Sequence, residues 1–367
     1  MGPSHGKKQD AGDSIISLVE HVATCVSAAL FNSFVLVGRV RTYPFFSPPP
    51  PLNLSDYPLS GAFIVLPPAL IWACFMWPTI AIPPCLTWLL WSFSRVEYGE
   101  GSPWPLYSKR FPMFPIMRHF FSLKISVHDA LVKHAQAPAN GQQSPPQYFI
   151  GLHPHGPTCD WRVYMDGLVD QELPFLSSWR VLSASVLFRL PYIRELCLWT
   201  HCIDASRGSA EKALKAGHTI FVTPGGEKEQ ILCQRGVEEV YITKRKGFVR
   251  LALKHGTPLV PCYVFGCTDA YTTSRFLYSL RLWLVKRFSI AIPFVFGGPF
   301  LIPCWPHQVQ LNVCFGEPIV LGKCQVPEEP SREEVNAAHD KYLRGLKQLF
   351  DENKEKYGYA NRELIIS

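Results

Sequence analysis

The chain has few charged residues. Only 18% of its 367 residues are Asp, Glu, Lys or Arg, whereas 47% are hydrophobic; a typical soluble protein has roughly 25% charged residues. Residues 57–94 carry no charge at all, and one bilayer-crossing helix needs about 20 apolar residues. So long an uncharged segment is rare in the core of a soluble domain. We therefore expect a transmembrane hairpin that turns near Pro78 and returns both ends to the cytosol.

Other absences exclude further classes of protein. Residues 1–12 lack the apolar core of a signal peptide, and position 6 is Gly rather than the Ser or Thr of a myristoylation signal. None of the twelve cysteines forms a CxxC pair, so we interpret them as small apolar side chains in a reducing compartment. There is no G-x-S-x-G motif of a serine hydrolase. The basic residues behind the net charge of +7 are scattered, which disfavours nucleic acid and favours phosphates on a small ligand or an anionic membrane.

The remaining chain divides by composition into an anchor region and one catalytic region. Segment 22–38 is also uncharged, and it is long enough either to span the bilayer or to lie at its surface. The connector is rich in Pro and aromatic residues, and the region after it alternates between strand-like and helix-like segments. We expect four parts: an N-terminal cytosolic or interfacial segment (1–56), the membrane hairpin (57–94), a connector (95–146) and a catalytic domain (147–367).

The catalytic region is predicted to be an α/β fold, with a mainly parallel sheet covered by helices. A Ser-x-x-Glu capping box at Ser331–Glu334 opens a C-terminal helix that is expected to reach about Tyr357. Shorter helices are expected at 209–215 and 246–254, the latter ending before Gly256. The expected strands are 147–152, 180–188, 218–222, 258–265 and 309–315.

Two histidines follow the apolar run 148–152, in the tetrapeptide His153-Pro154-His155-Gly156. Imidazole ionises near neutral pH and is suited to proton transfer. Two other interpretations stay open: the pair is half of a metal site, or the rings only satisfy backbone groups at a strand end. Without a serine elbow, we favour a histidine base that activates a substrate hydroxyl for acyl transfer from a thioester. Beside a bilayer anchor, such a site indicates an enzyme acting on lipids.

The tetrapeptide resembles the HPHG signature of the type-2 diacylglycerol acyltransferase family, which includes monoacylglycerol acyltransferases and wax synthases. About 240 residues, 119–358, match the family in order. The resemblance implies an endoplasmic-reticulum membrane enzyme with a glycerolipid-acyltransferase-like fold, a cytosolic catalytic domain and lipid droplets as a second location. It implies acyl-CoA as co-substrate, no other cofactor and no metal. The further matching segments are Arg189–Glu195, Asp204–Arg207, Pro224–Gly226 with Glu229, Arg245–Gly266, Gly316–Ile319 and Lys354–Gly358.

The resemblance also implies roles for individual residues. His155 is expected to be the general base, and His153 to shape the site or donate to the developing oxyanion. Asp160 lies at the His-x4-Asp spacing of glycerol-phosphate acyltransferases, where the carboxylate orients the imidazole. Residues expected to bind substrate are Pro154, Gly156, Arg207, Gly225, Gly226, Glu229, Arg245, Lys246 and Gly247.

Neighbouring basic residues and one departure from the family refine this expectation. Lys244, Arg250 and Lys254 join Arg245 and Lys246 as candidates for the CoA phosphates, and a solvated helix start is the alternative. The uncharged segment 288–306 is expected to form a membrane-dipping wall that admits the lipid acceptor. Family members commonly carry Glu where Cys267 stands, with Asp269 two positions later, so an acidic role there is in doubt.

The residues leave several functions open. Transfer to diacylglycerol, giving triacylglycerol, is the leading interpretation, and monoacylglycerol or a fatty alcohol are the alternative acceptors. A non-catalytic lipid-droplet or membrane scaffold, and a metal-dependent membrane hydrolase, are the alternatives of another class. The bilayer is an expected partner, and the chain is compatible with a homo-oligomer.

Overall fold

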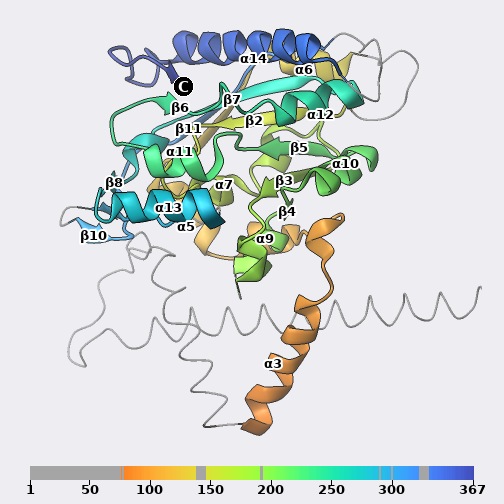
Figure 1. The fold of residues 1–367 in the computed structure, drawn as a ribbon, viewed down its shortest axis with the longest axis vertical. Coiled ribbons are helices and arrows are strands. Elements are labelled where there is room, and N and C mark those ends of the chain that lie inside the picture. Colours follow the sequence, from red (N-terminus) through yellow and green to blue (C-terminus); the bar gives the residue numbers. More distant parts are fainter. Residues whose placement is uncertain are drawn as a thin grey trace, which may run out of the picture.

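A seven-stranded sheet forms the centre of the molecule in the computed structural model (Figure 1). The structure describes residue 76 and residues 78–137, 146–190, 193–288, 291–298, 301–321 and 330–367. All neighbouring strands are parallel except β7 and β11, so the prediction of a mainly parallel α/β sheet is confirmed. The strand order is β1 (Lys124–Val127), β11 (Asn312–Phe315), β7 (Leu259–Phe265), β2 (Phe149–His153), β5 (Thr219–Val222), β3 (Trp179–Ser183) and β4 (Cys202–Asp204).

The central strands are covered on both faces, which explains their sequences. Every residue of β2 and of β7 is buried, as expected for parallel strands that read as continuous apolar runs. All five predicted strands are present, but the strand expected at 180–188 ends already at Ser183, and a 3-10 helix follows at Leu187–Arg189. β1 was not predicted, and it lies in the expected connector 95–146. It pairs with β11, so that segment contributes a strand to the catalytic sheet.

Two hydrophobic cores lie on the two faces of the sheet. One contains side chains of the predicted helices α10 (Arg207–Lys215), α12 (Gly247–His255) and α14 (Arg332–Asn353). Figure 1 shows α14 lying along one side of the sheet. The other core contains side chains of α5 (Met113–Phe120), α6 (Asp129–Gln136), α7 (Asp160–Met165) and α9 (Ile193–Trp199), with the short helices α4 (Pro105–Arg110) and α8 (Val169–Glu172).

The start of α14 confirms the predicted capping box. The Ser331 hydroxyl accepts the Glu334 N–H at 3.1 Å, and the Glu334 carboxylate accepts the Ser331 N–H at 2.8 Å. Val335, Tyr342 and Leu346 are buried against the sheet. The capped end and this apolar stripe together hold the helix in place.

Smaller elements surround the carboxyl ends of the strands. α11 (Gly226–Leu232) follows β5, and α13 (Tyr278–Phe288) lies near a small antiparallel sheet. That sheet contains β8 (Thr272–Thr273), β9 (Val295–Gly297) and β10 (Ile302–Pro303). A separate parallel pair joins β6 (Glu239–Val240) to the C-terminal β12 (Ile365–Ile366).

The first arm of the predicted membrane hairpin, up to residue 75, lies outside the described residues, and so does all of segment 22–38. Its second arm forms α3 (Pro78–Ser92), a 15-residue helix that projects from the side opposite α14 (Figure 1). Leu86, Leu90 and Phe93 are exposed there, at 53%, 68% and 73%. Among the described residues, no helix combines the length and the apolar character needed to cross a bilayer. The hairpin therefore stays a prediction.

Replacing Gly151 with Ala should destabilise the sheet centre. A Cβ at Gly151 would lie 1.9 Å from Tyr342 Oη, so β2 and α14 would have to separate, at a cost of about 1–3 kcal/mol. Gly208 of α10 is the matched control, because a Cβ there meets no atom within 4 Å. Thermal unfolding in detergent should show a lowered Tm for Gly151→Ala only. Equal behaviour of the two variants would contradict this packing.

Candidate active site

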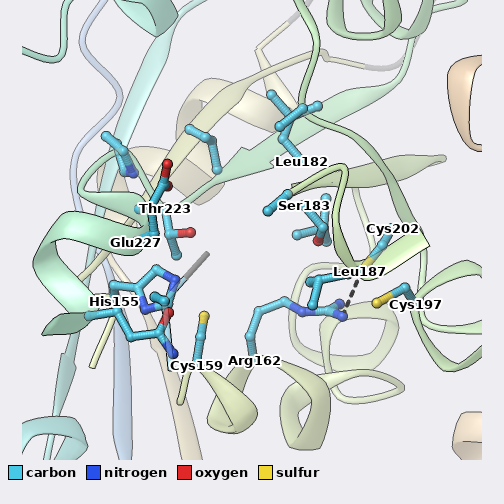
Figure 2. A pocket seen from close by; sticks show the side chains of 18 of the residues that line it. His155, Cys159, Arg162, Leu182, Ser183, Leu187, Cys197, Cys202, Thr223 and Glu227 are labelled. Carbon is cyan, nitrogen blue, oxygen red and sulfur yellow. Dashed lines mark hydrogen bonds between the residues drawn. The ribbon is translucent and has the colours of Figure 1, made fainter. Parts of the chain in front are cut away.

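A cavity of about 960 Å³ opens at the carboxyl ends of four neighbouring parallel strands. Its wall includes His155 after β2, Thr223 after β5, Ser183 at the end of β3 and Ala205 after β4. Figure 2 shows His155, Thr223 and Ser183 around this space. Ligands of open α/β sheets bind at this end of the strands, where loops can vary without disturbing the sheet. The cavity is therefore the candidate active site.

The cavity wall has an apolar part and a basic part. Apolar side chains come from residues 181–187, α9 and the segment around β9, which includes Pro293 and Val295. That segment belongs to 288–306, which was predicted to wall the site. The basic part consists of Arg207, Lys244, Arg245, Lys246 and Arg250, and Arg162 also lines the cavity, on its apolar side.

His155 presents one ring nitrogen as a free base. Its Nδ1 lies 2.9 Å from the Gly156 carbonyl oxygen. A carbonyl only accepts, so Nδ1 must carry the proton and Nε2 is left with an unprotonated lone pair. Nε2 has no hydrogen-bond partner among the described residues. Burial lowers the pKa of His155, with partial opposition from the Gly156 carbonyl and Glu227. The ring is therefore neutral at pH 7.

A buried carboxylate holds the backbone of His155. One oxygen of Glu229 accepts the His155 N–H, and the other accepts the Tyr241 N–H at 2.7 Å. Gly225 makes room for it, since a Cβ there would lie 1.9 Å from Glu229 Oε2. Burial raises the pKa of Glu229 to about 7, although the hydrogen bonds from the two backbone N–H groups lower it. Glu229 and Gly225 do not line the cavity, so they support the site rather than touch a ligand there.

The expected pairing of His155 with Asp160 does not form. Cys159 adopts a left-handed conformation (φ 55°), and Asp160 begins α7 with its carboxylate facing other partners. It accepts hydrogen bonds from Thr158, from Tyr164 at 3.1 Å and from Tyr271 at 2.6 Å. Burial keeps the pKa of both tyrosines well above the usual value, so they remain donors. Asp160 lines the cavity, but the partner of the His155 ring is the Gly156 carbonyl.

His153 is directed away from the cavity. Its ring is fully buried, and Nε2 lies 3.0 Å from Tyr342 Oη on α14. Burial lowers the pKa of His153 to about 3, so the ring stays neutral. The expected oxyanion role does not fit this position, because the ring does not line the cavity. The expected shaping role does fit, since the His153–Tyr342 contact fixes the end of β2. The His155 ring thus faces the cavity, and the His153 ring faces Tyr342. The two rings do not point to a common position, as a metal half-site would require.

The remaining predicted residues divide between the wall and its support. Gly156 (φ +69°) lies behind the wall, where a Cβ would meet Cys267 Sγ at 2.4 Å, and Pro154 contributes only its carbonyl, 3.7 Å from that sulfur. Lys254 does not line the cavity and pairs with Glu211 at 3.2 Å. Gly226, Gly247, Arg207, Arg245 and Lys246 do line it.

The basic side chains at the cavity differ in whether protein groups already occupy their hydrogen-bond donors. Lys246 Nζ donates to Asn336 at 2.7 Å, and Arg207 Nε donates to Glu211 at 2.9 Å. The Arg245 Nε atom is buried and has no partner among the described residues. Arg245 thus keeps this donor unused in the part of the chain that the structure describes.

An arginine–cysteine contact in the apolar part was not predicted. Arg162 Nη2 lies 2.9 Å from Cys202 Sγ, and Nη1 donates to the Thr200 carbonyl at 2.7 Å. Figure 2 shows this contact, with Cys197 beside it. Burial alone would raise the pKa of Cys202, but a hydrogen bond from Cys197 and the Arg162 charge lower it to about 6. Cys202 is a buried, free cysteine, as the interpretation of the cysteines expected, and no local motif indicates its contact with Arg162.

Further wall residues were also missed. Tyr164, Tyr271, Glu227 and Gln230 line the cavity beside His155 and Asp160. The i,i+4 spacing of Asp160 and Tyr164 was the one available signal, because such residues face each other on a helix. Within the part of the chain that the structure describes, no group of three or more side chains is arranged to hold a metal ion.

Comparison with known proteins matches this chain to a family model. The model described as diacylglycerol acyltransferase matches residues 114–367. That range contains every strand of the central sheet and every residue of the cavity wall. It also includes β1, within the segment that the sequence suggested was a connector.

Individual relatives are moderately similar. The chain is 31% identical over 242 residues to diacylglycerol O-acyltransferase 1 of Eremothecium gossypii, covering 60% of this chain and half of that protein. It is 33% identical over 248 residues to human 2-acylglycerol O-acyltransferase 3, covering 62% and 69%. The crystal structure of the 1-acyl-sn-glycerophosphate acyltransferase from Thermotoga maritima covers 81% of this chain and 94% of its own. The two chains are 16% identical, and the TM-score is 0.37.

Glu229→Gln should change the pH dependence of stability. A carboxyl whose pKa rises from 4.5 to about 7 on folding stabilises the fold fully below pH 4.5, and that contribution, roughly 3 kcal/mol, is lost as pH rises through 7. The variant should therefore become more stable relative to the wild type between pH 5 and pH 8, as measured by urea unfolding. The exposed Glu333→Gln is the control. A stability difference that does not change with pH would contradict the assignment.

Proposed function

Because the chain belongs to the diacylglycerol acyltransferase family, we propose that it moves a fatty acyl group from acyl-CoA to the free hydroxyl of diacylglycerol, making triacylglycerol. The observation that carries this proposal is the state of His155. Its Nε2 is unprotonated, has no protein partner among the described residues, and belongs to a side chain in the wall of a cavity of about 960 Å³. That volume lies at the upper end of the range for small-molecule sites.

The reaction follows from this geometry. His155 Nε2 accepts the proton of the acceptor hydroxyl as the oxygen attacks the thioester carbonyl carbon. The tetrahedral intermediate collapses, the C–S bond breaks, and the departing CoA thiolate takes the proton back from the imidazolium. No covalent acyl-enzyme is required. Because burial disfavours the charged ring, the imidazolium is short-lived and returns its proton readily.

The two parts of the cavity wall suit the two parts of acyl-CoA. The basic side chains around the start of α12 would bind the phosphates of CoA, and Arg245 Nε has no hydrogen-bond partner among the described residues. The apolar part, formed by residues such as Leu187 and Leu196, would hold the fatty chain. The thioester would then lie between them, beside His155.

The acceptor would enter from a membrane. α13 exposes Trp283 and Phe288, and the segment before it exposes Phe276, each more than half exposed. Pro293 and Val295, which follow α13, line the cavity. Such an apolar surface suits contact with a bilayer. We accordingly propose an endoplasmic-reticulum membrane location with the cavity on the cytosolic side, and lipid droplets as a second location.

Monoacylglycerol is the second candidate acceptor. The relative named 2-acylglycerol O-acyltransferase 3 is as similar to this chain as the diacylglycerol O-acyltransferase. The same base and cavity would serve either alcohol. The acceptor is therefore decided by competition between diacylglycerol, monoacylglycerol and a fatty alcohol, with the products identified by mass.

His155→Ala should abolish most turnover. Loss of a general base typically costs 10²–10⁴-fold in rate, so membranes with this variant should form triacylglycerol from acyl-CoA and diacylglycerol at about that reduced rate. His128→Asn is the matched control, because His128 is exposed and only caps α6. Near-normal turnover by His155→Ala would remove His155 from the mechanism.

Neutralising the phosphate candidates should separate the two substrates. Arg245→Gln with Lys246→Gln should raise the KM for acyl-CoA by at least about tenfold, since loss of a single hydrogen bond to a charged group costs roughly 1.5–3 kcal/mol. The KM for diacylglycerol should barely change. The control is Lys341→Gln with Lys347→Gln, which removes the same charge from α14. An unchanged KM for acyl-CoA would contradict the assignment of this part of the wall.

A further inference from the structure

Arg362, near the C-terminus, binds two carboxylates from different parts of the chain. Its Nη1 donates to Glu238 at 2.7 Å and to Asp269 at 2.7 Å, and its Nη2 donates to Asp269 at 3.2 Å. The Glu238 side chain is buried, Asp269 is mostly buried, and Arg362 is 31% exposed. A buried carboxylate that loses its cation is strongly destabilised. Arg362 therefore ties the segment at Glu238 to the segment at Asp269.

The Glu238 segment leads to the backbone of His155. Glu238 precedes β6, and the N–H of Tyr241, just after β6, donates to Glu229. The other oxygen of Glu229 accepts the His155 N–H. A shift of β6 would therefore pull on the carboxylate that holds His155.

The Asp269 segment touches the same turn from the other side. Asp269 ends a short 3-10 helix, Cys267–Asp269. Cys267 Sγ lies 3.7 Å from the Pro154 carbonyl, and it fills the space where a Cβ of Gly156 would stand. Asp269 lies two positions after Cys267, which stands where family members commonly carry Glu. Its carboxylate is paired with Arg362.

The C-terminal segment is itself held firmly against β6. β12 pairs with β6 in parallel register, and the Ser367 carbonyl accepts the N–H groups of Ile242 and Thr243. Tyr359 also donates to Asp269 at 2.9 Å. Arg362 therefore sits in an ordered strap, not on a loose tail.

We propose that Arg362 is a positioning residue for His155, acting through the two segments that flank the His155 turn. Its role in catalysis depends on the proposed acyltransferase function. Its effect on the turn does not, and can be measured separately. The two consequences therefore distinguish a failure of this inference from a failure of the proposed function.

The first measurement is hydrogen–deuterium exchange by mass spectrometry on the full chain in detergent. Arg362→Ala should speed exchange of the His155 and Tyr241 amides about tenfold, because the turn opens more often, while peptides of β3 stay unchanged. Arg362→Lys should give a smaller change, since it keeps the charge but loses the two-pronged contact. Arg194→Ala is the control, because it removes the buried contact with Glu97 (3.0 Å) elsewhere. That variant should leave the His155 turn protected.

The second measurement is the kinetics of acyl transfer. Arg362→Ala should lower kcat by about 10–100-fold, the effect of a slightly misplaced catalytic group, with both KM values little changed. If Arg362→Ala fails to fold, Asp269→Asn serves instead, since it removes one of the two ion pairs and keeps the shape. Unchanged exchange at His155 would overturn the proposal whatever the activity. Faster exchange with an unchanged kcat would also overturn it, and if the wild type transfers no acyl group, the exchange result alone decides.

Discussion

The chemistry of the cavity depends on one hydrogen bond, from His155 Nδ1 to the Gly156 carbonyl. A carbonyl oxygen has no proton to give, so the bond determines which ring nitrogen is protonated. The same bond keeps the ring at the cavity wall. The site therefore obtains a free base although no carboxylate among the described residues is hydrogen-bonded to the ring. In a serine-protease triad the same work is done by a buried aspartate.

Two carboxylates near the site, those of Asp160 and Glu229, bind groups other than the His155 ring. Asp160 takes hydroxyl donors from Tyr164 and Tyr271 and contributes a hydrogen-bonded patch to the wall. Glu229 lies behind the wall and holds backbone N–H groups. Neither carboxylate forms a hydrogen bond with the His155 ring that would stabilise its protonated form. Burial therefore keeps the pKa of His155 below its usual value. A neutral ring is what proton abstraction from an alcohol at neutral pH requires.

The sequence predicted the sheet well because its central strands are buried on both faces and therefore read as apolar runs. β1 was missed because it is only partly buried, and β4 because it contains only three residues. The position of His155 at a strand end was predictable from the run before it. The contact between Glu229 and His155 was not, since the two residues are 74 positions apart. The His155–Asp160 pairing failed because the left-handed backbone at Cys159 turns Asp160 toward Tyr164 and Tyr271, a turn that spacing alone does not reveal.

The same limit applies to the apolar side of the cavity. Arg162 and Cys202 lie 40 positions apart, and they meet only because α7 packs beside the start of β4. The basic residues at 244–246 were predictable as a group, because a charged run at a helix start is visible locally. Which of their donors are already occupied was not predictable, because Lys246 donates to Asn336, a distant residue on α14.

The most direct test of the His155 tautomer is nitrogen-15 NMR of the full chain labelled in histidine, with His155→Gln used to assign the signals. At pH 7 the His155 ring should show a protonated Nδ1 and an unprotonated Nε2. A ring protonated at Nε2, or at both nitrogens, would contradict its role as the base.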